Sequence, residues 1–464
     1  MRIFSLLICL AVFTSLSAQE KSEKQNMFFI GFADKAGTPY EIEQPDVYLS
    51  ERALLRRALH ETEITEMDLP ISPDYEDQVA ATGAQIWLRS KWMNGVVVKA
   101  TNQELKAINK LRLVNSSYLV APAQYTRAST KPVIPNLDRP APAFDPVPVS
   151  KKFYGYGWES LDRMEGDSLH SWGFRGKGVL VAVFDGGFPN VGYQDFLGYH
   201  DASWVPANYD VVQQDSTALD GGNHGSTVLS TMAAHHPFFF IGTAPDARYV
   251  LFKTENGRGE HRLEEINYAI ALEIADSIGV DVVNSSLGYT TFTDKSMNYT
   301  YEDLDGKTSP ASIAIGRAFD RGMVIVTSAG NSGGDEWKYL GTPADAPDAL
   351  SIGAINGEGE KVYFSSFGPT ADGRIKPDVS ALGVNVPAIA ANGSGIKGAS
   401  GTSLSSPLVA GLMACLRQAV PDATNQELLD AVRATANQAD SPDSELGYGR
   451  PNFAAAYRML IKAR

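Results

Sequence analysis

The serine at position 403 has a sequence context that suits a nucleophile. Ser403 lies in GASGTSLSSPLVAG, where a glycine-rich loop leads directly into a strongly apolar helical segment. A serine hydroxyl attacks a carbonyl well only when a neighbouring base removes its proton, and the amino terminus of a helix adds favourable positive partial charge. Taken alone, Thr402 or Ser403 could instead be an ordinary helix cap.

A histidine and an aspartate upstream have the types needed to activate such a serine. His224 lies in GGNHGSTVLS, at a predicted helix start, with glycines on both sides that leave its ring open to a partner. Asp185 follows the apolar run 179–184 directly, and a carboxylate at a buried strand end is costly unless it is hydrogen-bonded. Each has an ordinary alternative on its own, a structural histidine and a turn aspartate.

An asparagine completes the set. Asn331 lies in SAGNSG, directly after the apolar run 323–328, and its amide can donate a hydrogen bond to a developing oxyanion. The chain order is Asp, His, Ser, with this amide between the last two, and it differs from the order in chymotrypsin-type enzymes and α/β-hydrolases. Four matches in this order favour a nucleophilic hydrolytic centre over four unrelated residues.

The segments around these residues predict the fold that positions them. Beyond residue 153, near-continuous apolar runs alternate with segments of helical spacing (263–277 and 312–322). Runs without polar alternation are typical of parallel strands covered on both faces. We therefore predict an α/β fold with a doubly wound, mostly parallel sheet, in which active residues gather at the carboxyl ends of the strands. The predicted strands are 179–184, 249–252, 280–284, 323–328 and 349–355.

The first third of the chain has a different organisation. Residues 1–18 combine a charged start, a short apolar run and small residues, as in a secretory signal peptide, and the run is too short for a membrane anchor. Residues 19–125 predict a small α+β domain of the split βαβ kind, followed by a proline-rich linker (126–152) that is open to proteolytic cutting. The domain's strands are expected at 28–33, 86–88, 96–100 and 114–121, and its helices at 51–60 and 103–111.

Composition excludes some classes of protein. The formal net charge of −14 argues against a nucleic-acid partner, which needs a basic surface. Of the two cysteines, Cys9 lies in the predicted signal peptide, so Cys415 is expected to be a single buried core residue without a disulfide. The glycines of 393–398 spell G-x-G-x-x-G, but no suitable strand precedes them, so a dinucleotide site is not expected.

Seven motifs make residues 153–464 resemble the subtilase family of serine peptidases: VAVFDGG, NHGSTVLS, VVNSSLG, SAGNSG, FSSFGP, RIKPDV and GTSLSSPLVAG. The resemblance implies a triad of Asp185, His224 and Ser403, an oxyanion hole with Asn331, and a covalent acyl-enzyme. It also implies substrate binding by Ser286, Leu287, Gly288, Ala329 and Gly330. The sequence departs from the family pattern at Gly186, Ser405 and Ser406, which affects fine specificity rather than catalysis.

The small amino-terminal domain resembles subtilase propeptides, which assist folding and block the site until they are removed. The predicted signal peptide indicates export without a membrane anchor, to the periplasm or the cell exterior, and a monomer is the default expectation. The resemblance implies that the protein acts on proteins or peptides and has its own propeptide as a partner. No cofactor is expected in catalysis; a structural calcium ion has no recognisable ligand spacing, although Asp210, Asp215 and Asp220 lie close in sequence. The alternative, a catalytically silent binding protein, would be expected to have lost one of the four central residues.

Overall fold

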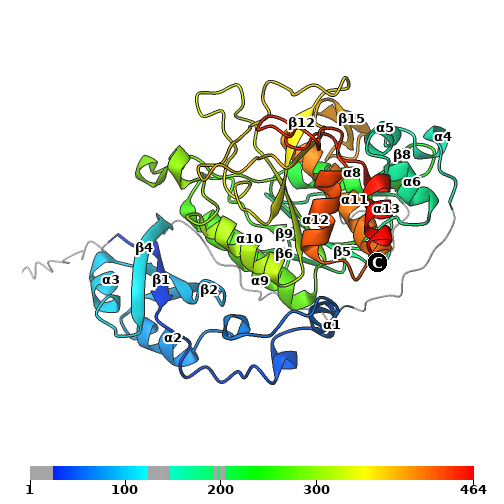
Figure 1. Cartoon of the computed structure of the whole chain (residues 1–464). Helices are drawn as coiled ribbons and strands as arrows, with labels where there is room; N and C mark the ends of the chain where they lie inside the picture. The colour runs from blue at the N-terminus through cyan, green and yellow to red at the C-terminus, as the bar shows by residue number, and fades with distance from the viewer. Residues whose placement is uncertain (1–23, 124–136, 138–146, 192–196, 199–203) are drawn as a thin grey trace, which may run out of the picture.

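The computed structural model describes residues 24–123, 137, 147–191, 197–198 and 204–464. The predicted signal peptide and most of the predicted linker lie outside the described residues. No described helix is both long enough and apolar enough to cross a membrane. The chain forms a large domain with a smaller amino-terminal domain beside it, and helices α9 (Arg262–Ile278) and α10 (Pro310–Asp320) lie between the small domain and the central sheet (Figure 1).

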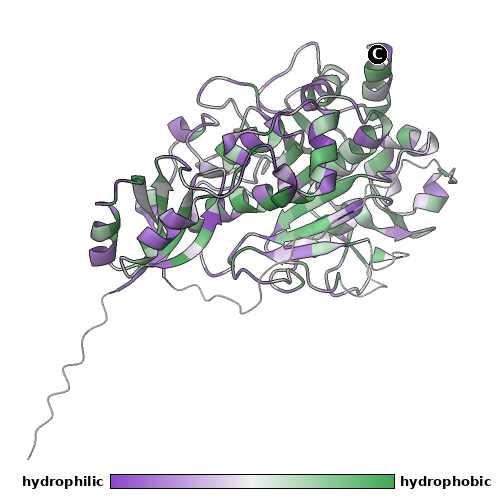
Figure 2. Ribbon diagram, turned by 90° about the horizontal axis from the view of Figure 1, so that it is seen from below, coloured by the Kyte–Doolittle hydropathy of each residue, from purple (hydrophilic) through white to green (hydrophobic). Residues whose placement is uncertain are grey.

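The large domain is built on a seven-stranded sheet in the order β13-β12-β11-β10-β5-β9-β6, with every neighbouring pair parallel. The predicted doubly wound parallel sheet is therefore confirmed. In Figure 2 the strands of this sheet are mostly green, that is, hydrophobic, whereas the covering helices mix green and purple. The strands are β5 (Leu180–Asp185), β6 (Ala207–Asp210), β9 (Arg248–Lys253), β10 (Val282–Ser285), β11 (Val324–Ser328), β12 (Ala349–Ile355) and β13 (Val379–Leu382).

Alternate residues of each strand enter different hydrophobic cores. Val181 and Val183 of β5 pack with helices α8 (His224–Ala233) and α11 (Thr402–Ala419). Leu180 and Phe184 of the same strand pack with α9 and α10 on the opposite face. Because side chains alternate between the two faces along a strand, each strand contributes residues to the core on both sides of the sheet. The other helices are α4 (Lys151–Tyr154), α5 (Trp158–Asp162), α6 (Gly166–Ser171), α12 (Asn425–Ala434) and α13 (Phe453–Lys462).

The large domain also contains two short β-hairpins outside the central sheet. One pairs β7 (His235–His236) with β8 (Phe240–Ile241), and the other pairs β14 (Val386–Ile389) with β15 (Ile396–Ala399). Gly393 and Gly395 lie in the turn of the second hairpin. A hairpin turn is not the strand-to-helix turn of a dinucleotide site.

The amino-terminal domain has a four-stranded antiparallel sheet in the order β2-β3-β1-β4. Helices α2 (Pro73–Ala80) and α3 (Asn102–Ile108) supply the two helices of the split βαβ pattern, and their residues Val79 and Ile108 pack on one face of the sheet. The other face packs in the same core as α9 and α10. The strands are β1 (Asn26–Phe32), β2 (Gln85–Ser90), β3 (Gly95–Ala100) and β4 (Val114–Pro122).

The predicted helix 51–60 forms as α1 (Glu51–Leu59), but it is not the first helix of the split βαβ unit. That place belongs to α2, which the sequence analysis did not predict because PDYEDQVA offers only Tyr75 and Val79 as large nonpolar residues. Helix α1 instead packs against the large domain beside the end of α9 (Figure 1).

Candidate active site

Asp185 and His224 are joined by a hydrogen bond at the carboxyl end of the central sheet. Asp185 is the last residue of β5 and His224 the first residue of α8, and His224 Nδ1 lies 2.8 Å from Asp185 Oδ2. The other oxygen, Asp185 Oδ1, accepts from the backbone N–H of Gly186 at 2.7 Å. The helix can approach this closely because residue 225 is glycine; a Cβ there would lie 2.4 Å from the carbonyl oxygen of Gly187.

The environment of His224 stabilises its protonated form. Burial alone would lower the pKa of His224, but the charge of Asp185 and its hydrogen bond outweigh this effect, so the pKa is raised. The Asp185 side chain is 2% exposed and that of His224 is 47% exposed. Because Nδ1 is engaged with the carboxylate, Nε2 is the ring nitrogen left for proton exchange with a substrate or a hydroxyl.

Ser403 is the second residue of α11 and borders the same small space as Asn331. A Cβ on Gly401, whose φ is +145°, would stand 3.0 Å from Ser403 Oγ and 3.5 Å from Asn331 Nδ2. Among the described residues, no hydrogen bond joins Ser403 to His224. Such contacts often tighten only when substrate binds.

The orientation of the Asn331 amide is fixed by Thr402. Asn331 Oδ1 accepts from the backbone N–H of Thr402 at 2.9 Å and from Thr402 Oγ1 at 3.0 Å. Because a backbone N–H can only donate, the oxygen of the amide must face Thr402, and Nδ2 is free to donate on the other side. From the sequence, Thr402 is expected only as a helix cap; its position directly before Ser403 was the available signal for this contact.

The carbonyl of Ser403 is held by a chain of buried side chains. Pro407 stands four residues after Ser403 in α11 and has no N–H to donate to this carbonyl. Instead Ser286 Oγ donates to Ser403 O at 3.0 Å, Asn284 Nδ2 donates to Ser286 Oγ at 3.2 Å, and Ser406 Oγ donates to Asn284 Oδ1 at 3.0 Å. The hydroxyl of Ser406, one of the residues that depart from the family pattern, thus belongs to this hydrogen-bond chain.

The predicted substrate-binding segment Ser286, Leu287 and Gly288 directly follows β10. In the described part of the chain, Leu287 and Gly288 make no backbone hydrogen bond, and Gly288 is exposed. The next residue, Tyr289, exchanges two backbone hydrogen bonds with Thr342, at 2.7 and 3.2 Å. The segment thus ends in an anchored residue and offers unpaired backbone groups to an extended peptide.

Ala329 and Gly330 follow β11 and are held rigidly. The N–H of Ala329 donates to Ile352 O at 3.0 Å, and the N–H of Gly330 donates to Thr402 Oγ1 at 3.1 Å. Gly330 has a φ of +106°, which favours glycine there. These contacts tie the predicted pocket wall to the start of α11.

Two groups of carboxylates lie close together in the large domain. The carboxylates of Asp210 and Asp220 both pair with Lys253 Nζ, at 2.9 and 2.8 Å, so a lysine already supplies their positive charge. In the second group, Glu255, Glu260 and Glu264 bring carboxylate oxygens within 4.8 Å of one another. Burial and mutual repulsion raise the pKa of both Glu255 and Glu264, which favours shared protons between these carboxyl groups.

Comparisons with known proteins cover both domains. A subtilase family model matches residues 176–449, and a model described as the Bacteroidota propeptide domain of peptidase S8 matches residues 27–133. Subtilisin NAT of Bacillus subtilis subsp. natto is 30% identical over 279 residues, which cover 60% of this chain and 65% of the relative. Subtilisin BL of Lederbergia lenta is 30% identical over 299 residues, which cover 64% of this chain and 97% of the relative.

A solved structure supports the fold. The crystal structure of MycP1 with its N-terminal propeptide removed aligns with a TM-score of 0.52 and 22% sequence identity, covering 64% of this chain and 96% of MycP1.

Proposed function

Because the chain belongs to the subtilase family of serine peptidases, we propose that it is a secreted endopeptidase that hydrolyses peptide bonds through an acyl-enzyme. The observation that carries the proposal is the 2.8 Å hydrogen bond between His224 and Asp185 beside a helix that begins with Thr402 and Ser403. A catalytically silent binding protein is the alternative, and nothing in the geometry of these residues favours it.

In the proposed reaction, Ser403 Oγ attacks the scissile carbonyl while His224 Nε2 takes the hydroxyl proton. The carbonyl oxygen becomes an oxyanion, and the backbone N–H of Ser403 and the Nδ2 group of Asn331 donate hydrogen bonds to it. Asp185 holds the ring in the required tautomer and stabilises its charged form. His224 then gives its proton to the leaving amine, and a water molecule, deprotonated by His224, hydrolyses the acyl-enzyme and restores Ser403.

The substrate is proposed to be an extended segment of a protein or peptide. Its backbone would pair with Leu287 and Gly288, and Ala329 and Gly330 would line the pocket for the side chain before the cut. The reaction uses only side chains, backbone groups and water, so we propose that catalysis needs no cofactor. The precursor is proposed to be a monomer exported by residues 1–18, with residues 19–125 as its own propeptide.

The test compares the purified precursor with a Ser403→Ala variant. Both are incubated with casein and with a peptide library, and their intact masses are followed over time. We expect cleavage of the substrates, and loss of a fragment of the precursor, only for the protein with Ser403. Inertness of both proteins, with the first one folded and its linker cut, would instead identify a silent binding protein.

A further inference from the structure

The carbonyl group of Ser403 lacks the hydrogen bond that a helix normally gives it. In an α-helix, the N–H four residues later donates to each carbonyl, but residue 407 of α11 is proline and has no N–H. Ser403 is 8% exposed, and a buried carbonyl without a partner is costly. The first turn of α11, which carries the proposed nucleophile, therefore needs a hydrogen-bond donor from outside the helix.

The donor is a serine of the proposed substrate-binding segment. Ser286 Oγ donates to Ser403 O at 3.0 Å. Ser286 directly follows β10, and the next two residues, Leu287 and Gly288, offer the backbone groups that are proposed to pair with the substrate. One hydroxyl thus joins the residue that would attack to the segment that would hold the peptide.

Two further buried side chains fix the direction of this hydrogen bond. A carbonyl oxygen can only accept, so the hydroxyl proton of Ser286 is used on Ser403. The Ser286 oxygen then accepts from Asn284 Nδ2 at 3.2 Å, and Asn284 Oδ1 accepts from Ser406 Oγ at 3.0 Å. Asn284 and Ser406 are both 0% exposed, so bulk water does not compete for these groups.

This chain of hydrogen bonds begins and ends on α11. It leaves the helix at Ser403, crosses to β10 and returns to the helix at Ser406. Val282 of β10 packs in the core that contains α11, whereas Val283 packs on the side of α9. Because side chains alternate along a strand, Asn284 faces α11. The start of the helix is therefore fastened to a strand of the central sheet.

We infer that Asn284 and Ser406 are positioning residues for the proposed nucleophile. Through Ser286 they fix the backbone of Ser403 relative to the substrate-binding segment, and so set the distance and angle at which Ser403 Oγ meets the scissile carbonyl. A small misalignment of reacting atoms lowers the rate of the chemical step more than it weakens substrate binding. The inference rests on the proposed function, because it concerns the reaction of Ser403.

The test measures kcat and KM of the processed enzyme with a chromogenic peptide. Ser406→Ala should lower kcat roughly 5-fold, as expected for the loss of about one hydrogen bond, while KM stays within about twofold. Ser286→Ala removes the direct contact and should lower kcat roughly 10- to 100-fold. In the Ser286→Ala background, Ser406→Ala should have little further effect, because both changes act through one carbonyl group.

Ser405→Ala is the matched control. Ser405 is the neighbour of Ser406 in the same helix and is also 0% exposed, but its hydroxyl has no hydrogen-bond partner among the described residues. Its replacement should therefore leave kcat within about twofold of the unaltered enzyme. An unchanged kcat in Ser406→Ala, or an equal loss of kcat in Ser405→Ala, would overturn the inference.

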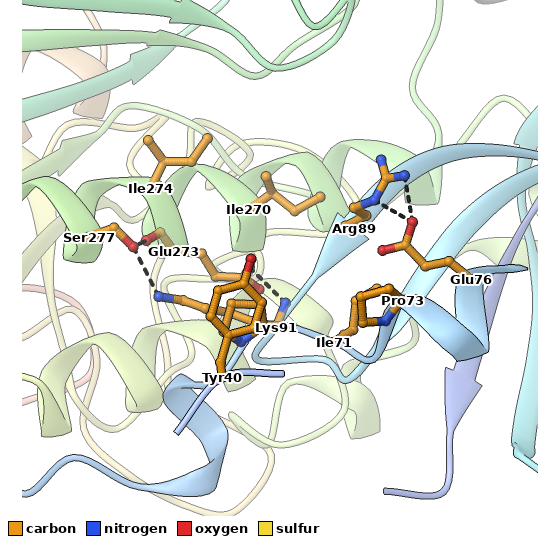
Figure 3. A pocket seen from close by; sticks show the side chains of 11 residues that line it. Tyr40, Ile71, Pro73, Glu76, Arg89, Lys91, Ile270, Glu273, Ile274 and Ser277 are labelled. Atoms are coloured by element: carbon orange, nitrogen blue, oxygen red, sulfur yellow. Dashed lines mark hydrogen bonds and ion pairs between the residues drawn. The ribbon is translucent and has the colours of Figure 1, made fainter. Parts of the chain in front are cut away.

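A second control separates positioning from stability. Ser277 of α9 is 6% exposed, donates to Glu273 O at 2.9 Å and accepts from Lys91 Nζ at 3.0 Å, beside a cavity of about 440 Å³ between α9 and the amino-terminal domain (Figure 3). In precursors that also carry Ser403→Ala, both Ser277→Ala and Ser406→Ala should lower the urea midpoint. In the active enzyme, only Ser406→Ala should lower kcat. A loss of kcat in Ser277→Ala that matches its loss of stability would reduce the hydrogen-bond chain to a structural role and overturn the inference.

The outcomes also separate this inference from the proposed function. Inertness of the unaltered enzyme would refute the proposed function and the inference with it, whereas an active enzyme with an unchanged kcat in the chain variants would refute the inference alone. If Ser406→Ala does not fold, Asn284→Ala takes its place, with the same expected loss of kcat. A variant that matures slowly is compared by the rate at which it cuts its own linker, which should fall by the same factor as kcat.

Discussion

Replacing Thr402 by valine should weaken catalysis without touching a reacting atom. Thr402 is fully buried, and its hydroxyl donates to Asn331 Oδ1 at 3.0 Å while accepting from the N–H of Gly330 at 3.1 Å. Valine keeps the shape of the side chain but removes both contacts. The backbone N–H of Thr402 still donates to Asn331 Oδ1, so the amide loses one of its two orienting hydrogen bonds.

The size of the effect follows from that remaining bond. A hydrogen bond of this kind contributes about 1 kcal/mol, which corresponds to roughly a fivefold change in the population of the productive amide orientation. We therefore expect kcat to fall about 5- to 10-fold while KM stays within about twofold, because Asn331 acts on an oxyanion that exists only during the reaction. The orphaned N–H of Gly330 should lower the free energy of unfolding by roughly 1 to 3 kcal/mol.

Steady-state hydrolysis of a chromogenic peptide measures both constants, and urea unfolding measures the stability. Thr402→Ser is the matched control, because it keeps the hydroxyl and should retain kcat within about twofold. In an Asn331→Ala background, Thr402→Val should cost little further activity, since the two residues act through one contact. Fully additive losses in the double variant, or an unchanged kcat in Thr402→Val, would refute the reasoning.

Four further predictions concern protonation, charge and the thiol. The specificity constant kcat/KM should rise with pH as His224 loses its proton, and the midpoint of this rise should lie above the ordinary histidine pKa of about 6.5. In a pH profile, Asp185→Asn should lower both the midpoint pH and the value of kcat/KM. The raised pKa also means that the pair stabilises the fold fully below about pH 6.5, and that this contribution disappears as pH rises through the pKa of folded His224; urea unfolding of both proteins at acidic and alkaline pH tests it. Lys253→Met should lower the free energy of unfolding by roughly 3 to 5 kcal/mol, because it leaves Asp210, which is 2% exposed, without its cationic partner. A decrease in the free energy of unfolding of less than about 1 kcal/mol would contradict this. Thiol reagents should leave the activity of the folded enzyme unchanged, because Cys415 is 0% exposed and burial raises its pKa; inactivation without unfolding would argue against it.

The long apolar runs made the central sheet predictable. Strands β5, β9, β10, β11 and β12 fall on the five predicted runs, because strands buried on both faces have little room for polar residues. Strands β6 and β13 were not predicted, since β6 reads ANYD and β13 reads VSAL, and neither forms a continuous apolar run. A short strand at the edge of a sheet leaves too little pattern in the sequence.

The candidate site was predictable at its centre and less so around it. Asp185, His224, Asn331 and Ser403 were expected from their motifs. The structure places Asp185 at a strand end, His224 and Ser403 at helix starts and Asn331 in the loop after β11. The contact that orients Asn331 was not foreseen, because it depends on which atom of the amide faces Thr402. The direction of a hydrogen bond between segments that are distant in the sequence depends on the tertiary structure and is not encoded in local sequence patterns.

The same limit applies to α1. Its arginines at positions 52, 56 and 57 have the spacing of an ordinary solvated helix face, and a charged stripe of this kind normally predicts exposure. Their burial depends on Asp276 and Asp281, more than 200 residues away in the chain. Only the folded structure brings these charges together.

Asp276 also bears on how freely the two domains could be recombined. Its side chain is 0% exposed, and among the described residues its cationic partners Arg56, Arg57 and Lys91 belong to the amino-terminal domain. A peptidase domain with such a carboxylate restricts which propeptides can pack against it. A chimera with a foreign amino-terminal domain would need either arginines at equivalent points or an uncharged residue at position 276. Each domain thus constrains the substitutions open to the other, and the two are expected to change together in evolution as one unit.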